Sequence, residues 1–220
     1  MKQLLLPLNA ISSYKRSAWI QGDCNSEAMK WIDSWPNWGN VKFVCVFGDM
    51  GSGKTHISHI FQDKTMALYW NARSLDLQSP YEMVGESPVI VLDNADYLSR
   101  NHSEWLFHLY NFVRENRIFL MMTGQAPPNH WETNLPDLRS RLATVVSVEL
   151  GRPDDSLLAA VFRKQLKERG MSVSLEASEY LLKRIDRSFG AVNTWINRLD
   201  RYAAVNHRTV TIPLIRELLD

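Results

Sequence analysis

The sequence has few cysteines, no long apolar run and almost no net charge. Its 220 residues include two cysteines, Cys24 and Cys45, so a disulfide framework is not expected. No segment approaches the roughly 20 apolar residues of a membrane span. Residues 1–8 are too short for a signal peptide and lack its small-residue cleavage site. The formal charge of +1 gives no case for a nucleic-acid surface. These absences predict a cytoplasmic protein without a membrane partner.

Residues 48–55 match G-x-x-x-x-G-K-[ST], the phosphate-binding loop of nucleoside-triphosphate binders. An apolar, β-branched run precedes the loop and a helical pattern follows it, which is the setting that the chemistry requires. Glycines let the backbone bend around the β-phosphate, and amides at the helix start face negative charge. The sequence predicts binding of ADP or ATP with Mg²⁺. The expected contact residues are Gly48, Gly51, Ser52, Gly53, the phosphate-binding Lys54, and Thr55, whose hydroxyl ligates the metal.

A second strand-to-polar junction lies at Asp93, which follows four apolar residues. In phosphate-loop proteins an aspartate at such a place holds Mg²⁺ from the neighbouring strand. The next residue is Asn94, where many ATPases have a second acid that polarises the attacking water. An amide can hydrogen-bond water but cannot take its proton. The junction therefore predicts nucleotide binding with slow hydrolysis.

The chain alternates strands and helices up to residue 150 and is helical afterwards. Expected strands cover 42–47, 66–70, 89–93, 118–123 and 144–150, with helices at 54–62 and 103–116 between them. Further helices are expected at 154–169, 174–187, 190–205 and 212–219. The alternation predicts an α/β fold with a five-stranded parallel sheet and helices on both faces, followed by a small helical domain.

Several segments resemble the DnaA-related branch of AAA+ proteins, and within it the Hda-type regulators. Residues 19–25 are similar to the box that borders the adenine in this branch, which implies a contact from Ile20. Residues 135–142 are similar to the box that carries the arginine finger, which would be Arg141. Residues 181–187, 199–201 and 211–213 resemble the Hda lid. The resemblance covers nearly the whole chain.

This resemblance implies an arm at 1–12, an AAA+ nucleotide-binding domain at 13–151 and a helical lid at 152–220. The initiator DnaA carries a further helix-turn-helix domain, whereas this sequence ends after the lid. The stretch between the second strand and Asp93 is also too short for the extra helices through which initiators engage origin DNA. Both features favour a regulator over an origin binder.

The first residues resemble the Q-L-x-L-P-L peptide by which Hda proteins bind the bacterial sliding clamp. Pro7 pre-sets an extended backbone, so little entropy is lost when leucines enter an apolar groove. The alternative is an apolar arm that packs on the protein itself. The implied contact residues are Gln3, Leu4, Leu6, Pro7 and Leu8.

Two positions depart from the family pattern. Gln125 stands where the family usually has an aspartate after the fourth strand, and its amide can still bond phosphate or water. Gly190 falls at the position of the lid's sensor arginine and offers no side chain. Arg187, one turn earlier, is an alternative sensor, although a solvated surface arginine is the simpler interpretation. Lid discrimination between ATP and ADP is therefore in question.

The leading hypothesis is a nucleotide-bound adaptor with weak or no ATPase of its own. It would dock on the sliding clamp, reach DNA only through the clamp, and present Arg141 to ATP held by the DnaA initiator. A homodimer is compatible with the sequence. The alternative is an autonomous AAA+ ATPase or helicase-loader-like remodeller, which Asn94 disfavours. A small-molecule phosphate-loop kinase is disfavoured because the tail resembles a lid. For Arg141, the simpler role is an ion pair with Asp137.

Overall fold

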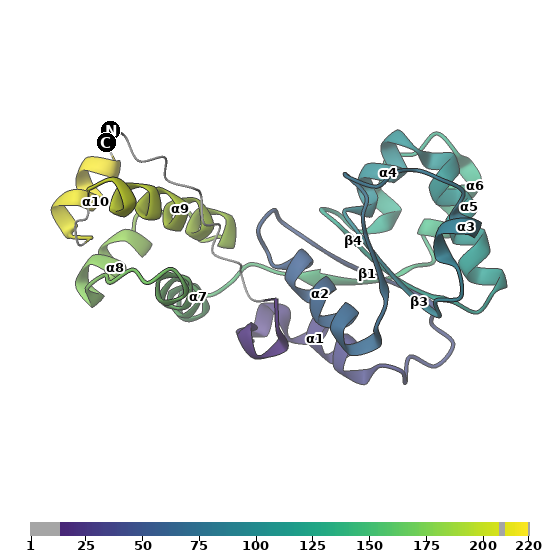
Figure 1. Ribbon diagram of the computed structural model, residues 1–220, viewed down its shortest axis with the longest axis horizontal. Coiled ribbons are helices and arrows are strands. Elements are labelled where there is room, and N and C mark those ends of the chain that lie inside the picture. The colour runs from purple at the N-terminus through teal and green to yellow at the C-terminus, as the bar shows by residue number, and fades with distance from the viewer. Residues whose placement is uncertain (1–13, 207–209, 220) are drawn as a thin grey trace, which may run out of the picture.

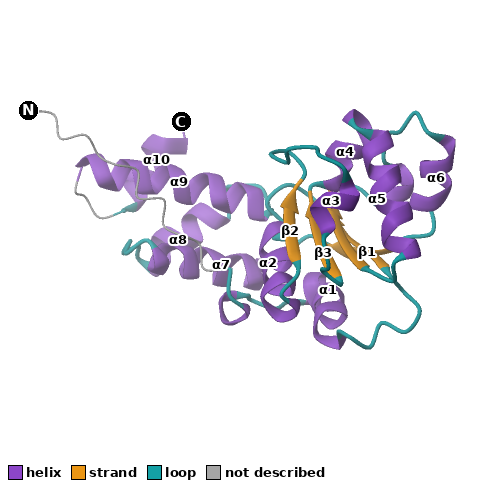
Figure 2. Ribbon diagram, turned by 45° about the vertical axis from the view of Figure 1, so that its right-hand side comes forward, coloured by secondary structure: helices purple, strands orange, loops and turns teal. Residues whose placement is uncertain are grey.

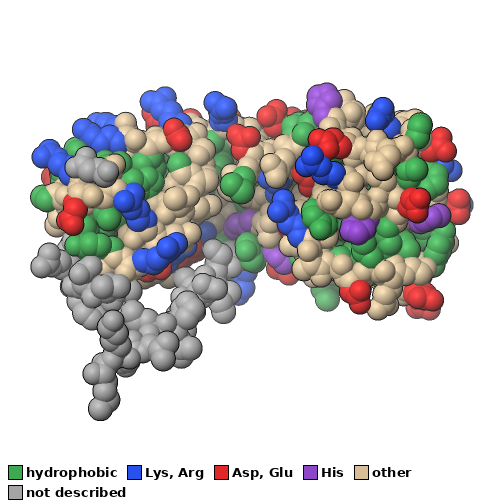
Figure 3. Space-filling model, turned by 90° about the horizontal axis from the view of Figure 1, so that it is seen from above, with side chains coloured by type: hydrophobic (Ala, Val, Ile, Leu, Met, Phe, Trp, Pro, Cys, Tyr) green, Lys and Arg blue, Asp and Glu red, His purple; other side chains and the backbone are tan. Residues whose placement is uncertain are grey.

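The structure is a computed structural model that describes residues 14–206 and 210–219. The predicted clamp-binding peptide, residues 3–8, lies outside these described residues. An α/β domain and a helical domain lie side by side along the longest axis of the molecule (Figure 1). Seen from above, acidic and basic side chains are spread over both domains (Figure 3).

The α/β domain is built on a five-stranded, fully parallel sheet, which confirms the predicted fold class. Its strand order is β2-β3-β4-β1-β5, so β4 separates β1 from β3. The registers pair Phe43 with Leu120 and Ile90 with Leu120 across β4. The strands are β1 (Phe43–Gly48), β2 (Leu68–Asn71), β3 (Val89–Asp93), β4 (Phe119–Gly124) and β5 (Val146–Leu150). They lie within two residues of the predicted bounds at each end.

Helices cover both faces of this sheet, as the strand-helix alternation predicts (Figure 2). One face packs on α1 (Asp23–Ser34) and α2 (Lys54–Thr65), through apolar residues such as Met29, Ile57 and Phe61. The other face packs on a group of helices that includes Leu98, Leu106 and Leu138 in its core. That group is α3 (Pro80–Val84), α4 (Ala95–Asn101), α5 (Ser103–Glu115) and α6 (Pro136–Leu142). Single 3-10 turns are η1 (Arg16–Ala18) and η2 (Pro128–His130).

The helical domain has an apolar core of its own, which includes Phe162, Leu181 and Ile196. Its helices are α7 (Asp155–Glu168), α8 (Leu175–Leu182), α9 (Phe189–Asn206) and α10 (Ile212–Leu219). The predicted helix 174–187 is wrong at its end, because α8 stops at Leu182. The segment after it turns, and the Ser188 side chain accepts a hydrogen bond from the Ala191 amide at 3.0 Å, which caps α9 instead.

The sequence prediction also missed short helices in the α/β domain. The five-residue α3 lies between β2 and Asp93, in a stretch for which no helix was predicted, and starts at a proline that is suited to a first turn. The box at 135–142 forms α6, which also begins with a proline. None of the described helices is both long and apolar enough to span a membrane.

Candidate functional site

The carboxyl ends of three neighbouring strands meet at one edge of the sheet. β1 ends at Gly48, β3 at Asp93 and β4 at Gly124, and β4 pairs with both of the others. In open parallel sheets, ligands bind at this edge, where the strand order reverses. The topology therefore brings the phosphate loop and Asp93 together.

The phosphate loop folds from β1 into α2. Gly51 and Gly53 have φ values of +82° and +103°, a region that strongly favours glycine. The Lys54 ammonium donates to the backbone carbonyls of Gly48 at 2.7 Å and Asp49 at 2.8 Å. Burial lowers the pKa of Lys54, and the nearby carboxylates of Asp96, Asp93 and Asp49 act in the opposite direction. This loop holds a cation among backbone amides, which suits a phosphate chain.

Asp93 is almost fully buried and accepts three hydroxyl hydrogen bonds. Thr55 Oγ1 and Tyr69 Oη donate to its Oδ2 at 2.8 and 3.0 Å, and Thr123 Oγ1 donates to its Oδ1 at 2.5 Å. Burial raises the pKa of Tyr69, and the Asp93 charge raises it further, so the phenol stays a donor. Thr55 and Asp93 thus place two oxygens beside the phosphate loop, which fits the oxygen preference of Mg²⁺.

Asn94 and Gln125 follow β3 and β4 and both line the same cavity. The backbone nitrogen of Asn94 donates to Thr123 Oγ1 at 2.8 Å, and the Asn94 side-chain amide donates to Asn71 Oδ1 at 3.4 Å. The backbone nitrogen of Gln125 donates to the Asp96 carboxylate at 3.0 Å. Asp96 is an acid near Lys54 that the sequence motifs did not single out, because it lies two residues after the Asp93-Asn94 junction.

A cavity of about 410 Å³ opens between the two domains. The phosphate loop forms one wall, and Tyr14, Trp19 and Ile20 contribute from the segment before α1. Asn25 fixes the backbone of this segment, because its side chain donates to the Ile20 carbonyl at 3.1 Å and accepts from the Gly22 amide at 3.0 Å. The predicted base-side residue Ile20 and the predicted phosphate-side residues 51–55 therefore face one cavity, whereas Gly48 is not part of its lining.

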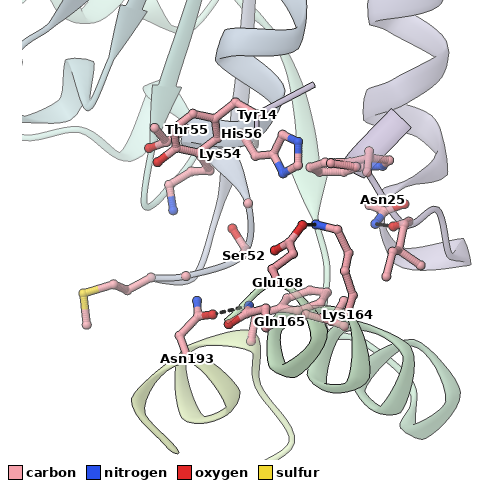
Figure 4. Close-up of a pocket in the computed structure, with 18 of the residues that line it drawn as sticks. Tyr14, Asn25, Ser52, Lys54, Thr55, His56, Lys164, Gln165, Glu168 and Asn193 are labelled. Carbon is pink, nitrogen blue, oxygen red and sulfur yellow. Dashed lines mark hydrogen bonds and ion pairs between the residues drawn. The ribbon is translucent and has the colours of Figure 1, made fainter. Parts of the chain in front are cut away.

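The lid supplies the remaining wall, which sequence reasoning missed. Figure 4 shows Lys164, Gln165 and Glu168 of α7 and Asn193 of α9 directed toward the labelled side chains of the α/β domain. Lys164 and Glu168 form an ion pair at 3.0 Å, and Gln165 donates to Asn193 at 2.5 Å. Val161 completes the α7 face. The spacing 161, 164, 165, 168 marks one helix face and is the signal that could have identified it.

The lid places no arginine in the cavity from the two positions predicted as sensors. Gly190 lies against the phosphate loop, where a Cβ on Gly51 would come within 2.9 Å of the Gly190 Cα. Arg187 pairs instead with Asp155 at 3.2 Å, and both side chains are exposed. Arg187 is therefore a solvated surface arginine, which was the simpler of its two interpretations.

Arg141 lies on α6, outside the cavity. Its guanidinium carbon sits 4.5 Å from the Phe107 ring centroid and 5.8 Å from that of Tyr110. Its Nη1 is buried without a hydrogen-bond partner among the described residues. No ion pair joins Asp137 to Arg141 in the described part of the chain, because the guanidinium stacks on the aromatic rings instead. The ion-pair interpretation was wrong.

The comparisons with known proteins bear on both domains. Residues 154–219 match the family described as "Hda, lid domain". The fold as a whole is similar to domain III of the Thermotoga maritima replication initiation protein DnaA, with a TM-score of 0.78 and 16% identity over 91% of this chain and 93% of that one. The C-terminal helical domain thus matches the lid of the Hda family, and the chain as a whole shares the fold of DnaA domain III.

Other solved structures share this fold. AMPPCP-bound DnaA from Aquifex aeolicus matches with a TM-score of 0.67 and 19% identity, over 90% of this chain and 66% of that one. The Holliday junction branch migration motor RuvB of Thermotoga maritima matches with a TM-score of 0.67 and 15% identity, over 94% and 72%. Proteins with different activities thus share this fold, and function has to be argued from the sites.

Proposed function

We propose that this chain is a nucleotide-binding adaptor that stimulates ATP hydrolysis by the DnaA initiator and so limits re-initiation of replication. Residues 3–8 dock it on the DNA-loaded sliding clamp, and Arg141 serves as the arginine finger. The Hda lid match and the DnaA-like fold support a DnaA-related regulator. The observation that supports Arg141 as the arginine finger is its position outside the cavity.

The cavity binds ADP or ATP in this proposal. Residues 48–55 hold the phosphates, with Lys54 as the cation, and Ile20 borders the base. Thr55 and Asp93 hold Mg²⁺, directly or through water, and the bound metal would neutralise phosphate charge. Hydrolysis by the chain itself is slow, because the Asn94 amide cannot accept a proton from water. The bound nucleotide therefore serves the fold and the interface.

Arg141 is too far from this cavity to act on its own chain's nucleotide. Its guanidinium lies near Tyr110, whose ring stacks at 4.0 Å on Phe43, the first residue of β1. The phosphate loop begins at the other end of the same strand, at Gly48. Six strand residues at 3.3 Å per step separate the two ends by about 17 Å. An arginine at this place acts only on a nucleotide held by another molecule.

The test replaces Arg141 by alanine in an assay with clamp, DNA and ATP-loaded initiator. A planar guanidinium bridges two phosphate oxygens, and a finger of this kind is worth about 10³–10⁵ in rate. Arg141→Ala should lose the stimulation, and Arg141→Lys should lose part of it. Arg139→Ala is the matched control, because Arg139 lies on the same helix, is exposed, and donates to the Thr133 carbonyl. Full stimulation by folded Arg141→Ala would refute the mechanism.

Nucleotide binding is tested separately through Lys54. Removal of the ammonium leaves the phosphate chain without its nearest cation, so Lys54→Ala should lose most of the affinity for ADP in a calorimetric titration. Lys64→Ala is a control on the same helix, since Lys64 donates to the Ile32 and Asp33 carbonyls away from the cavity. Equal ADP binding by Lys54→Ala and the unmodified chain would contradict the assignment.

A further inference from the structure

The two ends of the interdomain cavity differ in chemistry. Lys54 and the loop amides form a phosphate end. Aromatic rings gather beside the loop, where Trp19 packs on Gly53: the Trp19 and His56 centroids lie 5.2 Å apart, and those of Tyr14 and His56 lie 5.6 Å apart. All three side chains line the cavity. Flat rings offer packing surfaces for a planar base, so this is the nucleoside end.

Helix α7 of the lid presents a donor and an acceptor side by side. Lys164 and Glu168 are four residues apart and joined at 3.0 Å, with only 28% and 32% of their side chains exposed. Both line the cavity, together with the apolar Val161 one turn earlier. A half-buried ion pair on a cavity wall is costly to keep without further hydrogen-bond partners, and a bound ligand supplies them.

The pair lies toward the nucleoside end. Figure 4 shows Lys164 and Glu168 across from His56. Burial lowers the pKa of His56 and a hydrogen bond to the Lys15 carbonyl raises it, while the charge of Lys164 lowers it and that of Glu168 raises it. The charges that act on the pKa of Lys54 come from the α/β domain alone. Geometry and electrostatics thus place the lid pair beside His56 rather than beside the phosphate-binding lysine.

Among the residues described, the lid places no charged side chain at the phosphate end, where its polar side chain is Asn193, whose Nδ2 would lie 3.5 Å from a Cβ at Gly51. Gly190 meets the phosphate loop with its backbone, and Arg187 is paired with Asp155 outside the cavity. The charged side chains that the lid contributes to the cavity therefore lie at the nucleoside end, and none of them can respond to the charge of an added γ-phosphate.

We propose that Lys164 and Glu168 recognise the edge of the nucleobase, so that the lid closes on the base rather than on the γ-phosphate. An ammonium beside a carboxylate complements an edge with an acceptor beside a donor, such as the ring nitrogen and exocyclic amine of adenine. The inference rests on the proposed nucleotide binding. It assigns to the lid a role in base selection that does not need a sensor arginine.

The test compares ADP with inorganic pyrophosphate, which carries the phosphate end alone. Lys164→Met and Glu168→Gln should each weaken ADP about tenfold, because hydrogen bonds to charged groups are lost, and should change pyrophosphate affinity less than twofold. Lys167→Met is the matched control, because Lys167 is an exposed lysine of α7 outside the cavity lining, and it should leave both unchanged. The swapped double variant Lys164→Glu with Glu168→Lys keeps an i,i+4 pair and the fold, but should weaken ADP at least as much.

Several outcomes overturn the inference. Unchanged ADP affinity in the folded variants would show that Lys164 and Glu168 do not contact the nucleotide. Equal losses of affinity for ADP and pyrophosphate would show that they contact the phosphates. If 2′-deoxy-ADP binds the unmodified chain as weakly as ADP binds Glu168→Gln, the pair reads the ribose instead. The Lys54→Ala variant tests the proposed nucleotide site separately from the lid contact. If this variant binds ADP as tightly as the unmodified chain does, the cavity is not the nucleotide site.

Discussion

At the residue scale, the groups assigned to the phosphate end are held by the protein's own atoms. Lys54 donates to two loop carbonyls and Asp93 accepts three hydroxyl hydrogen bonds. These bonds fix both side chains in place, so little conformational entropy is left to lose on binding. Arg141 contrasts with them, since stacking on Phe107 holds its guanidinium while one nitrogen is buried without a described partner.

His56 makes the stability of the fold depend on pH. Burial lowers the pKa of His56 from 6.5, so the native chain binds fewer protons at this residue than the unfolded chain does. The free energy of unfolding should therefore fall as the pH drops below about 6.5. His56→Gln should show a weaker decline between pH 7 and pH 5.5 in urea unfolding.

The exposed His130 provides the control, because His130→Gln should keep the decline of the unmodified chain. If His56→Gln and the unmodified chain show the same pH dependence of the unfolding free energy, His56 is not the cause of the decline.

At the element scale, the start of α9 lies directly on the phosphate loop. A Cβ at Gly190 would lie 3.1 Å from the Met50 carbonyl oxygen, a tight contact that the glycine avoids. Ser188 caps the same helix end through the Ala191 amide. The glycine thus lets the lid helix approach the loop, at the position where the family resemblance expects an arginine.

A charge at this position should restore sensitivity to the γ-phosphate. Gly190→Arg should raise the ratio of ATP to ADP affinity about tenfold, because a charged hydrogen bond to the added phosphate becomes available. Gly190→Ala brings the same Cβ without the charge and should weaken both nucleotides alike. Calorimetric titrations with both nucleotides measure the ratio, and equal ratios for the two variants would exclude the charge effect.

At the scale of the whole molecule, the proposed functions belong to separate groups of residues. The cavity lies between the domains, Arg141 lies near the opposite end of β1, and the clamp peptide precedes the described residues. Variants in one group should leave the others intact, since distant sites act independently.

The clamp peptide provides the test of this independence. Replacement of Leu6 and Leu8 by alanine should abolish capture by immobilised sliding clamp, because the apolar anchors are removed, while ADP affinity stays unchanged. Replacement of Ser12 and Ser13 by alanine is a control in the same segment that keeps the anchors. If the clamp retains the leucine variant as well as the unmodified chain, the segment is an apolar arm and not a clamp-binding peptide.

Much of the fold and the phosphate end follows from local sequence patterns. The loop at 48–55 and the junction at Asp93 are contiguous motifs, and parallel topology brings strand ends to one edge. The end of α8 was missed because capping of the next helix by Ser188 competes with its continuation. The contact of Arg141 with Phe107 and the approach of α7 to His56 join distant segments, and no local pattern encodes such tertiary distances.

The packing of Trp19 gives the protein an optical reporter. Its indole ring packs so closely on the loop that a Cβ at Gly53 would lie 3.1 Å from its Cζ3, and its Nε1 is buried with no described partner. Of the eight tryptophans in the sequence, it is the one that lines the interdomain cavity. A nucleotide entering there changes the polarity around this indole, so the emission spectrum should shift on titration, and Trp19→Phe should abolish the shift. Binding can then be followed in real time without a label.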